Sequence, residues 1–175
     1  MNYFELYEIP VSININQDVV KKKYYQLSKE FHPDFYITES DEKQAEILEL
    51  STVNTNAYNT LKDEKKLIKY ILELYSLIEE SGEKLPQEFL MEMMDLNEQL
   101  MELEFDFDEN VITKVKKVLD EKQAELVKLV TPFSEDLSKL NSNDRVLELN
   151  KLKDYYLKRK YLLRIQERLD KFAAR

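Results

Sequence analysis

The sequence predicts an all-α protein, and three observations point to that class. Only one of the 175 residues is glycine, a residue that tight turns and strand bends usually need. Charged residues make up 35% of the chain and apolar residues 43%, a balance typical of solvated helices that bury a real core. Apolar residues also recur with the helical period. The clearest series, at i, i+4, i+7 and i+11, is Val20, Tyr24, Leu27 and Phe31.

Capping and breaking residues place the individual helices. Pro10 ends a short first helix, because proline cannot continue a ladder of backbone hydrogen bonds. The next helix starts near Gln17, with Asn14 and Asn16 as N-cap candidates, and it stops before Pro33. Helices are expected at residues 3–8, 17–31, 41–62, 65–78, 87–104, 109–130, 132–140 and 144–173.

A break in the helical pattern divides the chain into two parts. Residues 79–86 contain the only glycine, Gly82, which suits the position after a helix, and Pro86, which suits the first turn of the next one. We therefore expect an N-terminal helical hairpin domain over residues 1–78, a linker over 79–86 and a C-terminal three-helix bundle over 87–175.

Composition excludes several classes of function. The net charge of −9 and the pI near 4.9 argue against nucleic-acid binding, since neutralising phosphates needs a dominant basic face. The chain has no cysteine and one histidine, which excludes disulfides, thiolate catalysis, cysteine-ligated clusters and multi-histidine metal sites. No apolar run approaches the roughly 20 residues that a membrane span needs, and no signal peptide is visible. A soluble, cytoplasmic protein without a metal or cofactor is expected.

The tripeptide His32-Pro33-Asp34 lies between two expected amphipathic helices and contains the only histidine. Lysines project from the preceding helix, opposite its apolar face or on its flanks: Lys21, Lys22, Lys23 and Lys29. No nucleophile, metal set or phosphate-binding glycine loop accompanies the histidine, which favours an interaction site over an enzyme. Two plainer interpretations stay open: His32 caps the end of the helix, where a cationic ring suits the helix dipole, and the lysines provide solubility.

This stretch resembles the J-domain, the module that activates DnaK-type chaperones. Residues 20–34 follow its signature without a gap: an apolar residue, a basic pair, tyrosine, leucine, an aromatic residue and then His-Pro-Asp. Residues 56–63 are similar to its third helix. The resemblance implies that the tripeptide and the basic helix face contact an acidic surface of the chaperone ATPase and trigger ATP hydrolysis there. It assigns chaperone binding to His32, Pro33, Asp34, Lys21, Lys22, Lys23 and Lys29.

The helix expected over residues 87–104 has two apolar stripes. One stripe must be core: Phe89, Met93, Leu96, Leu100 and Leu103. The second lies about 100–140° around the helix and holds Leu90, Met94 and Met101. Four of the chain's five methionines lie here, and flexible thioethers suit an adaptable binding surface. The alternative is a wide core stripe filled with methionine.

Three segments resemble HscB, the J-type co-chaperone of iron–sulfur cluster assembly: residues 3–10, 70–74 and, for its scaffold-binding helix, 89–100. The resemblance implies that an IscU-like scaffold protein docks on this helix. It assigns scaffold binding to Leu90, Met91, Met94, Asp95 and Glu98. The family has leucine in place of Met94 and glutamate in place of Asp95, and both changes keep the chemistry. An aromatic residue of the last helix also contacts the scaffold in this family. Ungapped alignment places Asp154 at that position, and the neighbouring Tyr155 is the aromatic candidate.

The sequence thus predicts a co-chaperone with no catalytic chemistry and no cofactor of its own. Its expected partners are a DnaK/HscA-type ATPase chaperone, which it would stimulate, and an IscU-like scaffold protein, which it would present to that chaperone for iron–sulfur cluster assembly or transfer. Nucleic acid and membranes are not expected partners. Two alternatives stay open: a J-protein adaptor for a different client, and a purely structural helical protein in which His-Pro-Asp is incidental.

Overall fold

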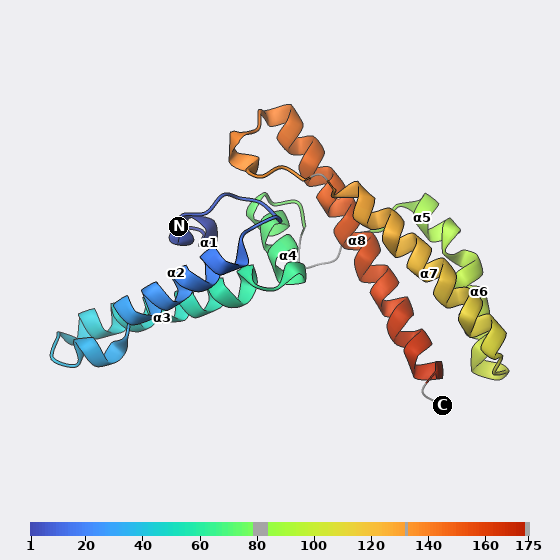
Figure 1. Ribbon diagram of the computed structural model, residues 1–175, viewed down its shortest axis with the longest axis horizontal. Helices are drawn as coiled ribbons and strands as arrows, with labels where there is room; N and C mark the ends of the chain where they lie inside the picture. Colours follow the sequence, from blue (N-terminus) through green and yellow to red (C-terminus); the bar gives the residue numbers. More distant parts are fainter. Residues whose placement is uncertain (79–83, 132, 174–175) are drawn as a thin grey trace. The chain divides into compact units, whose positions relative to one another are not determined.

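The computed structural model describes residues 1–78, 84–131 and 133–173, and it is built from helices joined by turns and loops (Figure 1). No strand occurs within these ranges, so the predicted all-α class is confirmed. No helix in them is both long and apolar enough to cross a membrane. The helical elements are α1 (Tyr3–Tyr7), α2 (Gln17–Glu30), η1 (Pro33–Tyr36), α3 (Asp41–Leu61), α4 (Glu64–Leu74), α5 (Gln87–Glu92), α6 (Met94–Phe105), α7 (Glu109–Leu129), η2 (Leu137–Lys139) and α8 (Ser142–Ala173).

Contacts between residues divide the chain into two compact units. The first unit comprises Met1–Tyr75 and Phe133–Arg145, and the second comprises Ser76–Pro132 and Val146–Arg175. Most of the expected linker, residues 79–83, lies outside the described residues. The division of the chain into functional domains stays a prediction.

The first unit is organised around α2 and α3, which form a helical hairpin with η1 at its far end (Figure 1). The side chain of Asn16 caps α2 by accepting two backbone N–H hydrogen bonds, of 2.9 and 3.3 Å. Val20 and Leu27 are buried, and the ring of Tyr24 stacks on that of Tyr58 from α3, with centroids 4.2 Å apart. The predicted apolar face of α2 is therefore confirmed.

A buried polar network joins α1, α2 and α3. The Tyr7 hydroxyl on α1 donates a hydrogen bond to the side-chain oxygen of Asn54 on α3 (2.9 Å). The Asn54 amide donates in turn to the Ser28 hydroxyl (3.0 Å) and to the Tyr24 carbonyl oxygen (3.2 Å), both on α2. Burial raises the pKa of the Tyr7 phenol, because a phenolate there would lose its hydration. Since the buried groups satisfy one another, the network fixes the register of three helices.

Residues 133–140 do not form the helix that the sequence predicts there. They contain only the single turn η2, because their polar groups bond to the loop before α2. The Leu137 N–H donates to the Val11 carbonyl oxygen (2.9 Å), and the Ser12 hydroxyl donates to the Ser134 carbonyl oxygen (2.7 Å). Leu137 is completely buried, so this segment belongs to the packing of the first unit.

The second unit contains α5, α6, α7 and most of α8. The rings of Tyr161 on α8 and Phe89 on α5 pack edge to face, with centroids 5.6 Å apart. Every residue of the predicted core stripe is buried, which confirms that part of the prediction. The core combines this stripe with residues of α7 and α8: Phe89, Met93, Leu96, Leu100, Leu103, Val115, Leu119, Leu126, Leu152, Leu162, Ile165 and Leu169.

Two further helices differ from the prediction by more than one or two residues at their ends. The helix expected over residues 87–104 is divided at Met93 into α5 and α6, and there the Asn97 side-chain amide donates a hydrogen bond to the Met93 carbonyl oxygen (2.7 Å). α4 ends at Leu74 rather than residue 78, because Ser76 takes a left-handed backbone conformation (φ 55°) that a helix cannot continue.

The buried network predicts that Asn54→Ala destabilises the protein by about 1–3 kcal/mol, because the hydroxyls of Tyr7 and Ser28 would lose a buried partner. Urea unfolding followed by circular dichroism measures the change. Asn56→Ala is the matched control: Asn56 is exposed on the same helix, and its loss should change the free energy of unfolding by less than about 0.5 kcal/mol. Equal effects of the two substitutions would contradict the structural role of Asn54.

Candidate partner-binding surfaces

The His32-Pro33-Asp34 turn lies at the end of the α2–α3 hairpin, on the protein surface. α2 ends at Glu30, and Pro33 opens η1, because a residue with a fixed φ and no N–H suits the first position of a helical turn. The His32 and Asp34 side chains are 51% and 77% exposed. The tripeptide is therefore both ordered and open to a partner.

His32 caps the start of η1 rather than the end of α2. Its Nδ1 accepts a hydrogen bond from the Asp34 backbone N–H (3.3 Å), so a neutral ring carries its proton on Nε2. Nε2 forms no hydrogen bond to any described residue. Oδ2 of Asp34 lies 3.8 Å from Nδ1. The turn thus presents a ring N–H donor and a carboxylate acceptor close together.

The four lysines that the sequence predicts at the partner interface fall into two kinds. Lys21, Lys22 and Lys29 are exposed, and none of them forms an ion pair with a described residue. Lys23 is half-buried and pairs with Glu8, the residue that follows α1. The hydrogen bond and the charge of Lys23 lower the pKa of Glu8. Lys23 therefore has a partner within the first unit, and the other three lysines form the free basic face of α2.

The second surface is an apolar stripe on α5 and α6. Leu90, Met91 and Met94 are 42%, 66% and 57% exposed, whereas their chain neighbours Phe89 and Met93 are 5% and 0% exposed. The interpretation of these methionines as one wide core stripe is therefore wrong, except at Met93. We call the exposed set, which also includes Met101, the Leu-Met stripe: Leu90, Met91, Met94 and Met101.

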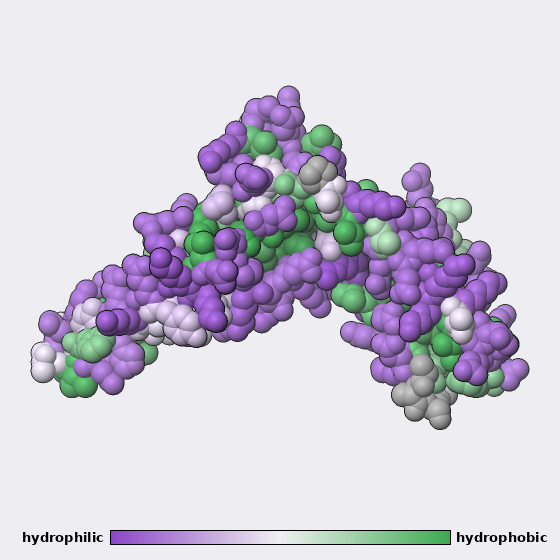
Figure 2. Space-filling view, viewed as in Figure 1, coloured by the Kyte–Doolittle hydropathy of each residue, from purple (hydrophilic) through white to green (hydrophobic). Residues whose placement is uncertain are grey.

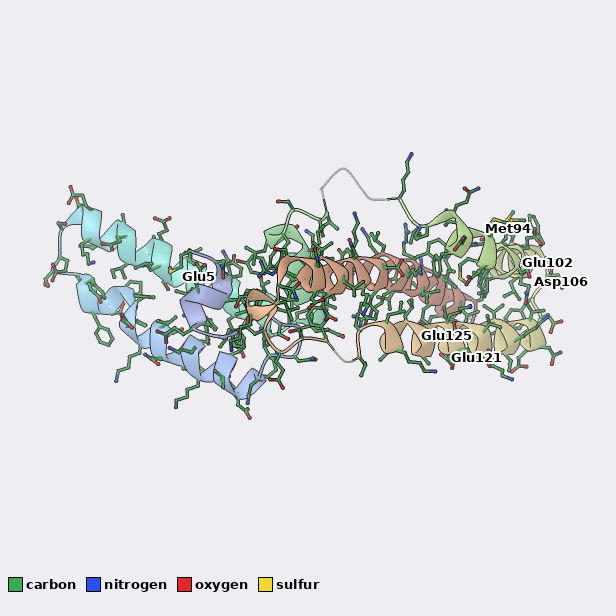
Figure 3. All side chains as sticks on the ribbon, turned by 90° about the horizontal axis from the view of Figure 1, so that it is seen from above. Glu5, Met94, Glu102, Asp106, Glu121 and Glu125 are labelled. Atoms are coloured by element: carbon green, nitrogen blue, oxygen red, sulfur yellow. The ribbon has the colours of Figure 1, made fainter. Side chains whose placement is uncertain are left out.

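Acidic side chains border the Leu-Met stripe. Asp95 and Glu98 are exposed on α6, and neither forms an ion pair within the described part of the chain. Glu102, which Figure 3 labels together with Met94, is a further exposed acidic side chain of α6. A surface of this kind, apolar with a negative rim, favours a partner that offers an apolar patch with basic residues around it.

Tyr155, the aromatic candidate on the last helix, is not accessible. It is 3% exposed, within the core of the second unit. The prediction that its ring contacts a partner is therefore wrong. Its neighbour Asp154 is held by an ion pair with Lys158 on the next turn (2.7 Å).

Sequence reasoning missed three exposed aromatic or aliphatic side chains near the two surfaces. Phe35 and Ile37 follow the tripeptide and are 65% and 69% exposed, and Phe105 at the end of α6 is 89% exposed. The available signal was spacing. Phe105 follows Met101 by four residues and so continues its face of the helix, while Phe35 and Ile37 lie in a loop with no helical stripe to bury them.

The His32-Pro33-Asp34 turn and the Leu-Met stripe are both exposed surfaces on which other molecules can bind. Among the described residues no group of three or more His, Asp or Glu side chains could hold a metal ion. The fold and the two surfaces therefore define a helical binding protein.

Known proteins of one kind resemble this chain. A family model described as "HSCB C-terminal oligomerisation domain" matches residues 85–170. Co-chaperone protein HscB from Buchnera aphidicola is 32% identical over 125 residues, which are 70% of this chain and 72% of that protein. An HscB homologue from Vibrio cholerae is 32% identical over 102 residues, 57% of this chain and 60% of that protein. The crystal structure of human co-chaperone protein HscB superposes with a TM-score of 0.67 at 24% identity, covering 97% of this chain and 81% of the human one.

The chain belongs to the HscB co-chaperone family. Members of this family are co-chaperones rather than enzymes, so the prediction of a non-enzymatic protein is confirmed. The likeness to the human structure also agrees with the all-α fold. Membership implies a chaperone partner.

The separation of the two stripes predicts a contrast in stability. Leu90→Ala combined with Met94→Ala should lower the free energy of unfolding by less than about 1 kcal/mol, since both side chains are already exposed. Phe89→Ala combined with Met93→Ala should lower it by about 4 kcal/mol or more, because buried side chains leave cavities. Denaturant unfolding of both double variants measures the contrast. Similar losses would mean that the Leu-Met stripe is part of the core.

Proposed function

We propose that this chain stimulates the ATPase of a DnaK/HscA-type chaperone and delivers an IscU-like scaffold protein to it, for iron–sulfur cluster assembly or transfer. Membership in the HscB family supports the co-chaperone role. One observation carries the rest: an ordered, exposed His-Pro-Asp turn lies directly behind a helix whose free face is basic. In this proposal residues 1–78 act as the J-domain and residues 87–175 as the scaffold-binding domain.

The basic face of α2 steers the encounter with the chaperone. Lys21, Lys22 and Lys29 have no ion-pair partner among the described residues, so their charges act on an approaching molecule. An acidic surface on the ATPase is complementary to them and raises the association rate, more strongly at low salt. Lys23 contributes less, because Glu8 offsets its charge.

The tripeptide acts after the encounter. Its turn is already held by hydrogen bonds within residues 32–35, so binding orders little additional chain. The Nε2–H donor of His32 and the carboxylate of Asp34 can then bond to polar groups of the ATPase. Loss of the ring therefore removes a specific contact.

The Leu-Met stripe supports the scaffold role. Burying Leu90, Met91 and Met94 removes apolar surface from water, and thioether side chains adapt to the shape of a partner. Asp95 and Glu98 supply a negative rim that selects against acidic partners. The two proposed surfaces share no residue, so one chain offers a site to each partner.

Steady-state ATP hydrolysis by a purified HscA-type chaperone tests the first surface. The wild-type chain should stimulate turnover, and adding the scaffold protein should stimulate it further. His32→Gln should abolish stimulation, because glutamine cannot reproduce the ring while the exposed position leaves the fold intact.

Thr38→Ala is the matched control for His32→Gln. Thr38 is exposed in the same loop, and its loss should leave stimulation unchanged. Full stimulation by the His32→Gln chain would instead support a purely structural role for the tripeptide.

Lys22→Ala combined with Lys29→Ala should raise the concentration of this chain that gives half-maximal ATPase stimulation and make that concentration less dependent on salt.

Calorimetric titration with the scaffold protein tests the second surface. Leu90→Ala combined with Met94→Ala should weaken binding by about 10- to 100-fold, the usual range for truncating two central apolar contacts. Stimulation of the ATPase without scaffold should not change. Val127→Ala is the control, because Val127 is 51% exposed on α7 of the same unit and lies outside the stripe. Unchanged affinity of the double variant would favour an adaptor for a different client.

A further inference from the structure

Two large apolar side chains stand out in the loop behind the tripeptide. Phe35 and Ile37 are 65% and 69% exposed, more than almost any other large apolar residue of the first unit. Figure 2 shows hydrophobic surface at the end of the α2–α3 hairpin, where this loop lies. Exposed apolar side chains this close to a proposed binding turn call for an explanation beyond chance exposure.

The loop is held in place, so the exposure is not a by-product of disorder. The Phe35 N–H donates to the His32 carbonyl oxygen (3.1 Å), which closes the turn η1. The Tyr36 hydroxyl donates to the Glu30 carbonyl oxygen (3.0 Å) and ties η1 to the last turn of α2.

A second set of hydrogen bonds holds the other side of the loop. The side-chain amide of Gln44 on α3 donates to the carbonyl oxygens of Ile37 (3.2 Å) and Glu39 (2.9 Å). Both ends of the loop are thus fastened to the hairpin. A partner meets Phe35 and Ile37 in a fixed conformation and loses little entropy on binding them.

Phe35 lies against the tripeptide itself. The rings of His32 and Phe35 are tilted with respect to each other, with centroids 5.6 Å apart. A protein seated on the exposed edge of His32 therefore reaches Phe35 as well.

The charge of the loop indicates what kind of surface suits it. Residues 34–42 carry four acidic side chains and no basic one, the reverse of the free face of α2. An acidic partner surface that attracts the lysines would be repelled here, whereas an apolar patch would not. Complementarity thus calls for two adjoining patches on one partner, an acidic one for α2 and an apolar one for the loop.

We infer that Phe35 and Ile37 form an apolar anchor that inserts into an apolar pocket of the ATPase chaperone, next to the acidic surface that receives the lysines. This inference rests on the proposed function of the tripeptide. The lysines set the rate of encounter, the tripeptide triggers hydrolysis, and the anchor sets how long the complex lasts. A second copy of this chain is the competing occupant, and the test below separates the two.

The experiment measures ATPase stimulation against concentration for the full chain and its variants. Phe35→Ala combined with Ile37→Ala should raise the half-maximal concentration about tenfold or more, as expected for truncating a central apolar anchor, with nearly unchanged maximal stimulation and salt dependence. The single substitution Phe35→Leu keeps a large apolar side chain at this position, so its half-maximal concentration should stay close to that of the wild-type chain. Leu48→Ala is the matched control, because Leu48 is 60% exposed on α3 of the same unit and should have no effect.

Three outcomes would overturn the inference. In the first, the double variant behaves like Leu48→Ala. In the second, Phe35→Ala lowers maximal stimulation while Ile37→Ala has no effect, which would mean that Phe35 only orients the His32 ring. In the third, the double variant changes self-association in sedimentation but not the chaperone titration. Calorimetric binding of the chaperone to the wild-type and double-variant chains keeps the two proposals apart. Binding weakened by the double variant without any wild-type stimulation would sink the proposed function and leave the anchor standing.

Discussion

The buried side chain of Asn54 is the contact on which the geometry of the first unit depends. Apolar packing between α2 and α3 tolerates small shifts along the helix axes, because methyl groups and rings have no directional requirement. Hydrogen bonds are directional and do not tolerate such shifts. The Asn54 amide donates one to the Ser28 hydroxyl and accepts one from the Tyr7 hydroxyl. The network therefore determines which face of α2 is turned to solvent and where the hairpin ends.

Sequence reasoning recovered the elements that local rules decide. The periodicity of apolar residues predicted α2 and the core stripe of α5 and α6, and Asn16 marked a true helix start. It failed where contacts distant in sequence decide. No local pattern shows that the Leu137 N–H bonds to Val11, more than a hundred residues away, instead of continuing a helical turn. At the break at Met93 the Asn97 amide donates not only to the Met93 carbonyl oxygen but also to the hydroxyl of the distant Tyr161 on α8 (2.6 Å).

The candidate surfaces show the same division. Helical projection separated the exposed Leu90 and Met94 from the buried Phe89, since angle around a helix is a local property. Projection could not show that Glu8 pairs with Lys23, nor that Tyr155 points into the core, because both depend on which element packs alongside. Phe35 escaped attention for a related reason: a loop residue has no periodic partner from which burial can be judged.

The connectivity of the units has a consequence for how such a protein can change. The chain leaves the first unit after Tyr75, re-enters it at Phe133 and leaves again after Arg145, so neither unit is a continuous stretch of sequence. A chain that contained only the N-terminal part of the first unit would lack Phe133 and Leu137, two buried side chains that the distant segment provides. The first 75 residues alone would therefore lack part of the core of the first unit.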